Sequence, residues 1–290
     1  MNQMNNQKTF FLGIGAAKSG TSWLYDYLNS HPEVSPGPIK EMHVLNSAGN
    51  QGFLKAVHQL PWHRFSGRKW LKENLWKAYY RANWDRYFSV YCRALKTNCK
   101  ATGEISTSYL SIDVNTLNFV KQRFMGIGVR TAGILVLRDP IEQLISSLKF
   151  KKRLSKENKY KESIDLSLDV MFSRAIENIS ETQANHYESA LSAITQAFDE
   201  EARFVELYEN LFNQESLDHL CDRLMIARFP GRFAKRVNET ITTESVCSFD
   251  VQTARNILDP AYRATAKFLG EDHVNEHWKY FSGFSGNFGH

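Results

Sequence analysis

The chain has 290 residues, of which 42% are hydrophobic and 23% charged, and its formal net charge is +5. This composition is typical of a globular protein and excludes a chain that is largely disordered or of low complexity. Lys and Arg are spread along the sequence, so the charge favours an anionic ligand but lacks the basic stripe of a nucleic-acid-binding protein.

Neither membrane insertion nor metal binding is indicated by the sequence. No stretch approaches the roughly 20 apolar residues of a membrane span, and the N-terminal residues lack the pattern of a signal peptide, so we expect a cytoplasmic protein. The four cysteines form no CxxC pair and no Cys/His cluster with zinc-ligand spacing. We therefore expect neither a disulfide framework nor a metal site.

The first elements in chain order are a strand, a loop and a helix. Apolar and small residues run from Thr9 to Ala16, a polar turn follows at residues 18–22, and apolar residues then recur at helical spacing. A second buried strand is predicted from Thr131 to Leu137, and Pro140 suits the first turn of the helix after it. Shorter strands are predicted at residues 101–105 and 203–207.

This alternation of strands and helices predicts one domain over residues 1–290, an α/β fold of the P-loop NTPase-like, three-layer type. Its central sheet should be mainly parallel. Residues 50–95 are rich in Trp and Tyr among basic residues and predict a helical insertion. Residues 149–165 form a basic, mobile segment, which is interpreted as a solvated surface or, alternatively, as a substrate lid.

Residues 13–22, GIGAAKSGTS, stand where a phosphate-binding loop should, after a buried strand and at the start of a helix. Nucleoside-triphosphate loops end in Gly-Lys-Ser/Thr, whereas here Lys18 precedes Gly20 by two residues. A lysine in this earlier position can approach the oxygen that bridges a phosphate and its leaving group. The alternative interpretation is a capped turn without function.

The second strand ends in Arg138, and Asp139 can cap the following helix instead of holding a metal. This arrangement disfavours ATP-magnesium chemistry. It leaves an arginine at the strand end, where its guanidinium can bind a phosphate together with a hydroxyl.

Two motifs together give a resemblance to a known family. The run from Lys18 to Leu24, KSGTSWL, resembles the 5′-phosphosulfate loop of nucleotide-dependent sulfotransferases. Those enzymes bind the donor's 3′-phosphate with an arginine and a serine eight positions later, as in Arg138 and Ser146. The resemblance implies that 3′-phosphoadenosine 5′-phosphosulfate is the donor and that no metal is required. Its implied binding residues are Lys18, Ser19, Gly20, Thr21, Ser22, Trp23, Arg138 and Ser146.

The segment Lys40-Glu41-Met42-His43 resembles the KE-x-H stretch of the carbohydrate-modifying branch, which includes the heparan-type enzymes and their bacterial relatives. The resemblance implies that Glu41 is the general base and that Lys18 stabilises the leaving group. His43 assists or orients the base, or is structural. Two further stretches, around Glu104 and Glu209, also resemble the family, and we assign these glutamates to architecture. Trp23 stacks on adenine or belongs to the core.

Three positions depart from the family pattern. Asn46 stands where the branch often has an acidic residue, and Gln143 where a second basic residue is usual. The basic loop that closes over the 3′-phosphate is not evident between residues 240 and 250. Arg232, Lys235 and Arg236 are candidates for replacing that loop, although ordinary surface charge accounts better for each of them.

The sequence therefore predicts a sulfotransferase whose acceptor is a hydroxyl of a carbohydrate or another small molecule. Two alternatives remain open at this stage. One is a P-loop kinase that uses ATP and magnesium, and the other is a non-catalytic nucleotide-binding protein of the same fold.

Overall fold

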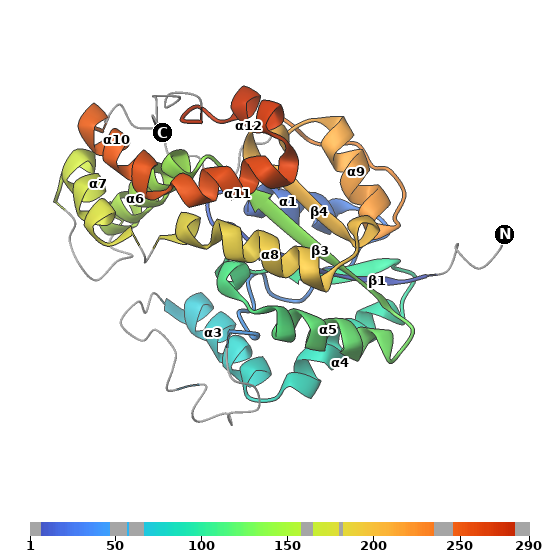
Figure 1. Ribbon diagram of the computed structural model, residues 1–290. Helices are drawn as coiled ribbons and strands as arrows, with labels where there is room; N and C mark the ends of the chain where they lie inside the picture. Colours follow the sequence, from blue (N-terminus) through green and yellow to red (C-terminus); the bar gives the residue numbers. More distant parts are fainter. Residues whose placement is uncertain are drawn as a thin grey trace.

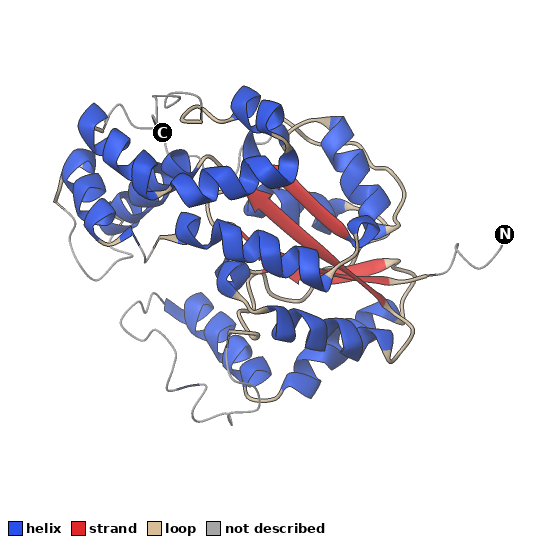
Figure 2. Cartoon of the chain, in the orientation of Figure 1, coloured by secondary structure: helices blue, strands red, loops and turns tan. Residues whose placement is uncertain are grey.

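The computed structural model describes residues 7–46, 57, 67–157, 165–179, 182–234 and 246–281. Four strands form one sheet, and helices surround it (Figures 1 and 2). The elements are β1 Thr9–Gly15, α1 Thr21–Ser30, α3 Gly67–Arg81, α4 Trp84–Leu95, β2 Ala101–Ile105, η3 Thr107–Ser111, α5 Val114–Met125, β3 Arg130–Leu137, α6 Pro140–Lys156, α7 Leu168–Glu177, η5 Gln183–His186, α8 Tyr187–Ala197, η6 Glu200–Ala202, β4 Arg203–Leu207, η7 Tyr208–Asn210, α9 Gln214–Leu224, α10 Ser248–Ile257, α11 Asp259–Leu269 and α12 Glu271–His277.

The sheet confirms the predicted α/β fold with a parallel sheet. Its strand order is β2-β1-β3-β4, and every neighbouring pair is parallel. Strands β2 and β4 have the predicted bounds, whereas β1 ends one residue before the predicted end and β3 begins one residue before the predicted start. An uninterrupted apolar run identified β3, and apolar and small residues identified β1, because the sheet is covered on both faces.

Successive side chains of β1 enter two different hydrophobic clusters, as expected for a strand that is buried on both faces. Phe11 packs with residues of α1 and α9, whereas Phe10 and Leu12 pack with residues of α4, α5 and α8. The sheet is therefore the middle layer of three. Figure 1 shows α8 and α11 crossing in front of the strands, with α3, α4 and α5 at one end of the molecule.

The connections after β1 and β3 lead to opposite sides of the sheet. From β1 the chain continues through α1 to β2, whereas from β3 it continues through α6 to β4 on the other side. In open parallel sheets, ligands bind at the carboxyl ends of the strands where such connections diverge. The loop after β1 and Arg138 after β3 both lie at this edge.

Composition singled out two segments, residues 50–95 and 149–165. Their described parts are mostly helical. In the aromatic segment, α3 and α4 follow one another, and Asn83 caps α4 by accepting from the amides of Asp85 and Arg86. In the basic segment, residues 149–156 continue helix α6. Residues 47–56, 58–66 and 158–164 lie outside the described part of the chain.

Candidate active site

The loop between β1 and α1 ends in a position that requires glycine. Gly20 has a φ of 75°, and a Cβ there would lie 3.0 Å from side-chain atoms of both Tyr208 and Leu211. Gly20 is also the N-cap of α1 and provides no side-chain hydrogen bond to the first turn. The amides at this helix start, together with the helix dipole, therefore favour an anion.

Two glutamine side chains hold the loop from other elements. The amide of Ala17 donates to Oε1 of Gln183 at 2.6 Å, and Gln183 Nε2 donates to the carbonyl of Thr107 at 3.1 Å. Gln143 Nε2 donates to the carbonyl of Ala17 at 3.1 Å, and the Gln143 side chain is only 2% exposed. Gln143, which stands where a second basic residue was expected, is thus buried and holds the loop by a hydrogen bond. We call this contact the Gln143 brace.

Lys18 lies in a strongly positive environment. Its Nζ is 4.4 Å from the ring centroid of Phe150 on α6. Burial is the main cause that lowers the pKa of Lys18 to about 8, and the charges of Arg153, Arg138 and Lys40 lower it further. Cations held together in this way disfavour one another, and a bound anion would relieve their repulsion.

Arg138 lies beside the loop at the carboxyl end of β3. Its Nη1 donates to the carbonyl of Lys18 at 3.1 Å, and its Nη2 is 3.4 Å from Oε2 of Glu142. The guanidinium carbon is 4.5 Å from the ring centroid of Tyr208. Two groups that are 120 residues apart in sequence, the phosphate-loop lysine and the strand-end arginine, are therefore adjacent in space.

Ser146 lies on the side of α6 that faces the loop. It is half-buried, and it stands three positions after Gln143 and four before Phe150, both of which contact the loop. Residues at this spacing share one face of a helix. Ser146 is also four positions after Glu142, which pairs with Arg138.

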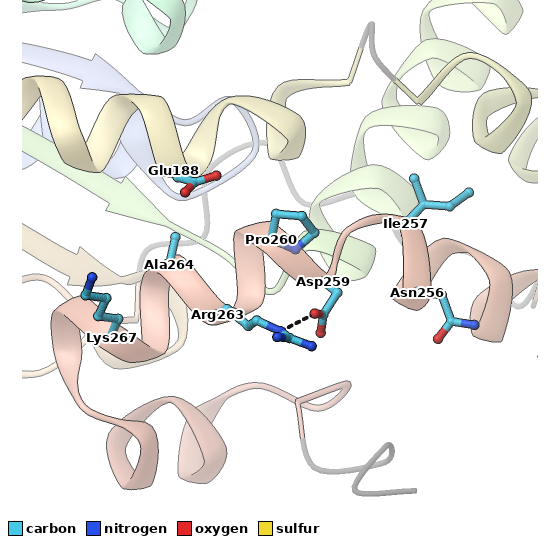
Figure 3. A pocket seen from close by; sticks show the side chains of 8 residues that line it. All are labelled: Glu188, Asn256, Ile257, Asp259, Pro260, Arg263, Ala264 and Lys267. Carbon is cyan, nitrogen blue, oxygen red and sulfur yellow. Dashed lines mark ion pairs between the residues drawn. The ribbon is translucent and has the colours of Figure 1, made fainter. Parts of the chain in front are cut away.

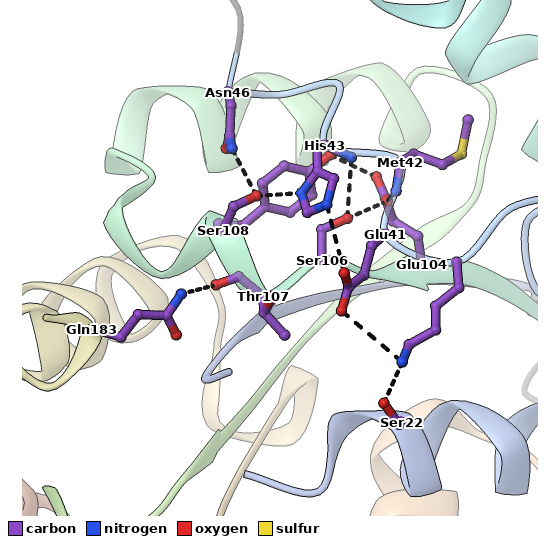
Figure 4. Close-up of polar contacts among 12 residues, drawn as sticks. Ser22, Glu41, Met42, His43, Asn46, Glu104, Ser106, Thr107, Ser108 and Gln183 are labelled. Carbon is purple, nitrogen blue, oxygen red and sulfur yellow. Dashed lines mark hydrogen bonds and ion pairs between the residues drawn. The ribbon is translucent and has the colours of Figure 1, made fainter. Parts of the chain in front are cut away.

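The KE-x-H segment contacts the first turn of α1 through its lysine. Lys40 Nζ donates to Ser22 Oγ in the first turn of α1 and lies 4.0 Å from Glu41 Oε1 (Figure 4). Glu41 Oε2 is 3.6 Å from Nε2 of His43. Both Glu41 and His43 have left-handed backbone conformations, with φ of 56° and 53°. Such conformations are costly for residues other than glycine, so they persist only where surrounding contacts fix them.

Glu41 is held in its ionised form. Burial opposes the negative charge, but hydrogen bonding to His43 and the charges of Lys40 and Lys77 help to outweigh it, so the pKa of Glu41 lies below its ordinary value. A carboxylate that is ionised and partly shielded from water is suited to accept a proton.

Glu104 on β2 fixes the backbone between these two residues. Its side chain is fully buried and accepts from the amide of Met42 at 3.1 Å and from Ser106 Oγ at 2.7 Å. The hydroxyls of Tyr87 and Tyr109 also donate to it, at 2.6 and 2.9 Å. Four donors around one buried carboxylate compensate for its desolvation and tie the KE-x-H segment to the sheet.

Trp23 is a core residue in this structure. It is 4% exposed, its ring stacks on Tyr27 and Phe233, and it meets Phe212 edge to face. Among the candidates for the missing basic loop, Arg232 is exposed, and Lys235 and Arg236 lie outside the described residues, as do residues 240–245.

Sequence reasoning did not identify several residues that complete the site. Gln183, Ser108 and Phe150 come from η5, η3 and the second half of α6, and none belongs to a recognisable motif. Arg81 on α3 donates to the carbonyl of His43 at 3.1 Å. Of these residues, only Phe150 could have been predicted from the sequence, because it lies four positions after Ser146 and therefore on the same face of the helix.

Other features of the described residues lie away from this site. A surface pocket of about 590 Å³ lies between α8, α10 and α11 and contains none of the predicted site residues (Figure 3). Within the described ranges, no three His, Cys, Asp or Glu side chains are grouped as metal ligands. None of the described helices is long and apolar enough to cross a membrane.

Comparisons with known proteins identify the fold. No protein-family model matches the sequence, and no curated protein matches it. The structure is similar to a sulfotransferase from Alicyclobacillus acidocaldarius, with a TM-score of 0.60 and 20% identity over 90% of this chain and 96% of that one.

Two further solved structures show a weaker similarity, each with a TM-score of 0.49 and 14% identity. They are the sulfotransferase domain of the Synechococcus PCC 7002 olefin synthase, which covers 87% of this chain and 95% of its own, and that of the curacin biosynthetic pathway, which covers 91% and 97%.

Proposed function

Because the chain has the fold of a solved sulfotransferase, we propose that it transfers a sulfuryl group from 3′-phosphoadenosine 5′-phosphosulfate to an acceptor hydroxyl. One observation carries the proposal: Arg138 donates to the carbonyl of Lys18 at 3.1 Å. Two anion-binding groups thus lie together at the ligand-binding edge of the sheet. A nucleotide with a 5′-phosphosulfate and a 3′-phosphate has two anionic groups to match them.

The donor's two anionic ends are assigned to different parts of the site. Lys18, Ser19, Gly20, Thr21 and Ser22 bind the 5′-phosphosulfate, helped by the amides at the start of α1. Arg138 and Ser146 bind the 3′-phosphate. Because its ring is packed against Tyr27, Phe212 and Phe233, Trp23 is not assigned to the adenine of the donor.

The transfer step forms a bond between the acceptor oxygen and sulfur and breaks the bond from sulfur to the 5′-phosphate oxygen. Glu41 takes the proton of the acceptor hydroxyl as it attacks. Lys18 stabilises the negative charge that develops on the departing phosphate. His43, 3.6 Å from Glu41, orients this base.

The acceptor lies on the α3 side of Glu41. This helix brings Arg81 to the backbone of His43 and Lys77 into the surroundings of Glu41. It also presents Trp76 and Tyr79, which are 45% and 37% exposed and meet edge to face. Helix periodicity turns both rings away from the face of α3 that carries Lys77 and Arg81, and the Arg86 guanidinium already lies over the Tyr79 ring. A carbohydrate or a similar hydroxylated acceptor is therefore proposed on the resemblance of the KE-x-H segment.

A kinase that uses ATP and magnesium is supported less well. Asp139, the acid at the end of β3, accepts from the amides of Ile141 and Glu142 as the N-cap of α6. Its carboxylate also accepts from the Tyr262 hydroxyl and the Tyr280 amide, both at 2.8 Å. An acid with four protein donors is poorly placed to bind a metal ion as well.

Thermal unfolding tests the donor, with 3′-phosphoadenosine 5′-phosphate added in EDTA and ATP added with excess magnesium in the absence of EDTA. We expect 3′-phosphoadenosine 5′-phosphate to raise the melting temperature more than ATP with magnesium does, because only the former has a phosphate for Arg138. A larger shift with ATP and magnesium would favour the kinase. Transfer of radioactive sulfate to a panel of sugars and alcohols then tests catalysis, and tight donor binding without any transfer would indicate a non-catalytic protein.

A further inference from the structure

We propose that Asn46 and Ser108 are positioning residues that set the tautomer of His43, and through it the state of Glu41. Four side chains contact one another in succession in Figure 4: Asn46, Ser108, His43 and Glu41. We call this chain of contacts the tautomer relay. Asn46 Nδ2 is 2.7 Å from Ser108 Oγ, which is 2.5 Å from His43 Nδ1, and His43 Nε2 is 3.6 Å from Glu41 Oε2. The inference rests on the proposed role of Glu41 as the base.

The direction of each hydrogen bond follows from the groups involved. An amide nitrogen can only donate, so Ser108 Oγ accepts from Asn46. The single hydroxyl proton of Ser108 is then free to point at His43 Nδ1, which accepts it as the unprotonated nitrogen of a neutral imidazole. Ser108 Oγ has a second lone pair and could instead accept from His43 Nδ1–H. The carboxylate of Glu41, however, can only accept, and its Oε2 is 3.6 Å from Nε2, so the single ring proton of the neutral imidazole belongs on Nε2.

This tautomer suits the proposed base. An Nε2–H directed at Glu41 stabilises the carboxylate without adding a full positive charge beside it, and it leaves the other carboxylate oxygen available to the acceptor. The opposite tautomer would place a nitrogen lone pair against the carboxylate. Repulsion between the two would then favour a proton on Glu41 itself, which would disable the base.

The backbone of His43 is fixed independently of the relay. Its amide donates to Ser106 Oγ at 3.3 Å, and its carbonyl accepts from Arg81 at 3.1 Å. Glu104 anchors the neighbouring amide of Met42. A change at Asn46 should therefore alter the proton on the ring and leave the position of the ring largely unchanged. The charged groups around this part of the site are Lys40 and Glu41 on the same segment, Lys77 and Arg81 on α3, and Glu104 on β2.

Asn46→Asp reverses the relay with almost no change of shape. A carboxylate can only accept hydrogen bonds, so the Ser108 hydroxyl donates to it. Ser108 Oγ then accepts a hydrogen bond from His43 Nδ1–H. Nitrogen-15 spectra of histidine-labelled protein, recorded above the titration range of histidine and assigned with His43→Gln, report the tautomer directly. We expect Nε2–H in the wild type and Nδ1–H in Asn46→Asp.

The kinetic consequence is a loss of turnover with donor binding retained. General-base catalysis contributes about 10²- to 10⁴-fold, so a misdirected base should lower kcat by about tenfold or more, while the Kd of 3′-phosphoadenosine 5′-phosphate stays the same. Ser108→Ala should lower kcat in the same way, and Ser108→Thr, which keeps the hydroxyl, should restore it. Asn178→Asp makes the same chemical change at the C-cap of the distant helix α7 and should leave the tautomer of His43 and kcat unchanged.

The relay is contradicted if the wild type carries its ring proton on Nδ1, or if Asn46→Asp leaves both the spectrum and kcat unchanged. Failure of the proposed function gives a different result. Nε2–H in the wild type, lost in Asn46→Asp, with no sulfuryl transfer by either protein, would support the relay and contradict the assignment of the enzyme.

Discussion

Lys18 and Glu41 are the two proposed catalytic residues whose pKa values are shifted by their surroundings. Burial and three neighbouring cations lower the pKa of Lys18, whereas a histidine and two lysines keep the pKa of Glu41 low despite its burial. The lysine is thus held in a state that an anion would stabilise, and the glutamate in a state that can accept a proton.

The pKa of Lys18, about 8, makes donor binding depend on pH. The lysine loses its proton as the pH rises through this value, and only its charged form attracts the phosphosulfate. We expect the affinity for 3′-phosphoadenosine 5′-phosphate to fall above pH 8, by at most about tenfold per pH unit. Titration calorimetry across this range would show the decline, and Lys18→Arg, which keeps the charge, should remove it.

Glu41→Gln removes the proposed base while keeping the size of the side chain. We expect kcat to fall by about 10²- to 10⁴-fold, because the acceptor proton then has no carboxylate to receive it. The Kd of the bound nucleotide should change little, since Glu41 is not assigned to the donor. Single-turnover transfer assays measure the first quantity, and intact activity would show that the base is another residue.

Helix α6 is the element that joins the two halves of the site. Its residues Gln143 and Phe150 contact the phosphate loop, and its first turn carries Glu142, which pairs with Arg138. All three contacts follow from a helix that starts at Pro140, immediately after the strand end that places Arg138. The helix therefore sets the distance between the groups assigned to the 5′ and 3′ ends of the donor.

Gln143→Ala tests the brace that α6 provides. Loss of one buried hydrogen bond, worth about 1 kcal/mol, should loosen the loop and weaken donor binding by about fivefold. Gln196→Ala, on the exposed side of α8, is the matched control and should bind as the wild type does. Fluorescence titration with the nucleotide compares the two, and an equal affinity in all three proteins would show that the brace is not needed.

The last described residues, around 278–280, are hydrogen-bonded to two acidic residues that follow strands β3 and β4. Glu209 after β4 accepts from the Trp278 indole at 3.1 Å, and Asp139 after β3 accepts from the Tyr280 amide at 2.8 Å. Burial raises the pKa of both carboxyls, and that of Glu209 reaches about 7. The folded protein therefore binds more protons than the unfolded chain between the ordinary carboxyl range and pH 7.

That difference predicts how stability varies with pH. Because the folded state holds the extra proton, Glu209 makes unfolding easier as the pH rises from about 4.5 to about 7. Glu209→Gln should flatten this decline in the melting temperature by about 2 °C or more across the interval. Scanning calorimetry at several pH values measures the slope, and the exposed Glu200→Gln should keep the wild-type slope.

For the molecule as a whole, the sheet was the most predictable part. Four buried strands were found within one residue of their ends. Strands β1 and β3 were marked by runs of apolar and small residues, as expected for strands covered on both faces, whereas β2 and β4 carry the buried glutamates Glu104 and Glu206. Lys18 and Arg138 were predictable as partners because parallel strands carry the loops that follow them to one edge.

The rest of the site depends on contacts between distant segments, which local patterns do not encode. Gln183 reaches Ala17 across 166 positions, and Glu104 holds Met42 across 62. Gln143 was read as a missing charge, whereas its buried amide braces the loop. Ser108 stood out in no motif, since its importance comes only from lying between Asn46 and His43.

The central claim is that one nucleotide is held at its 5′ end by the loop of Lys18 and at its 3′ end by Arg138. The most direct test compares the Kd of 3′-phosphoadenosine 5′-phosphate with that of adenosine 5′-monophosphate, without magnesium, in the wild type and in Arg138→Met. A hydrogen bond to a charged group is worth about 1.5 to 3 kcal/mol, so the wild type should prefer the 3′-phosphorylated nucleotide by about tenfold or more, and Arg138→Met should lose this preference. An equal affinity of the wild type for both nucleotides, or a preference that survives in Arg138→Met, would contradict the account.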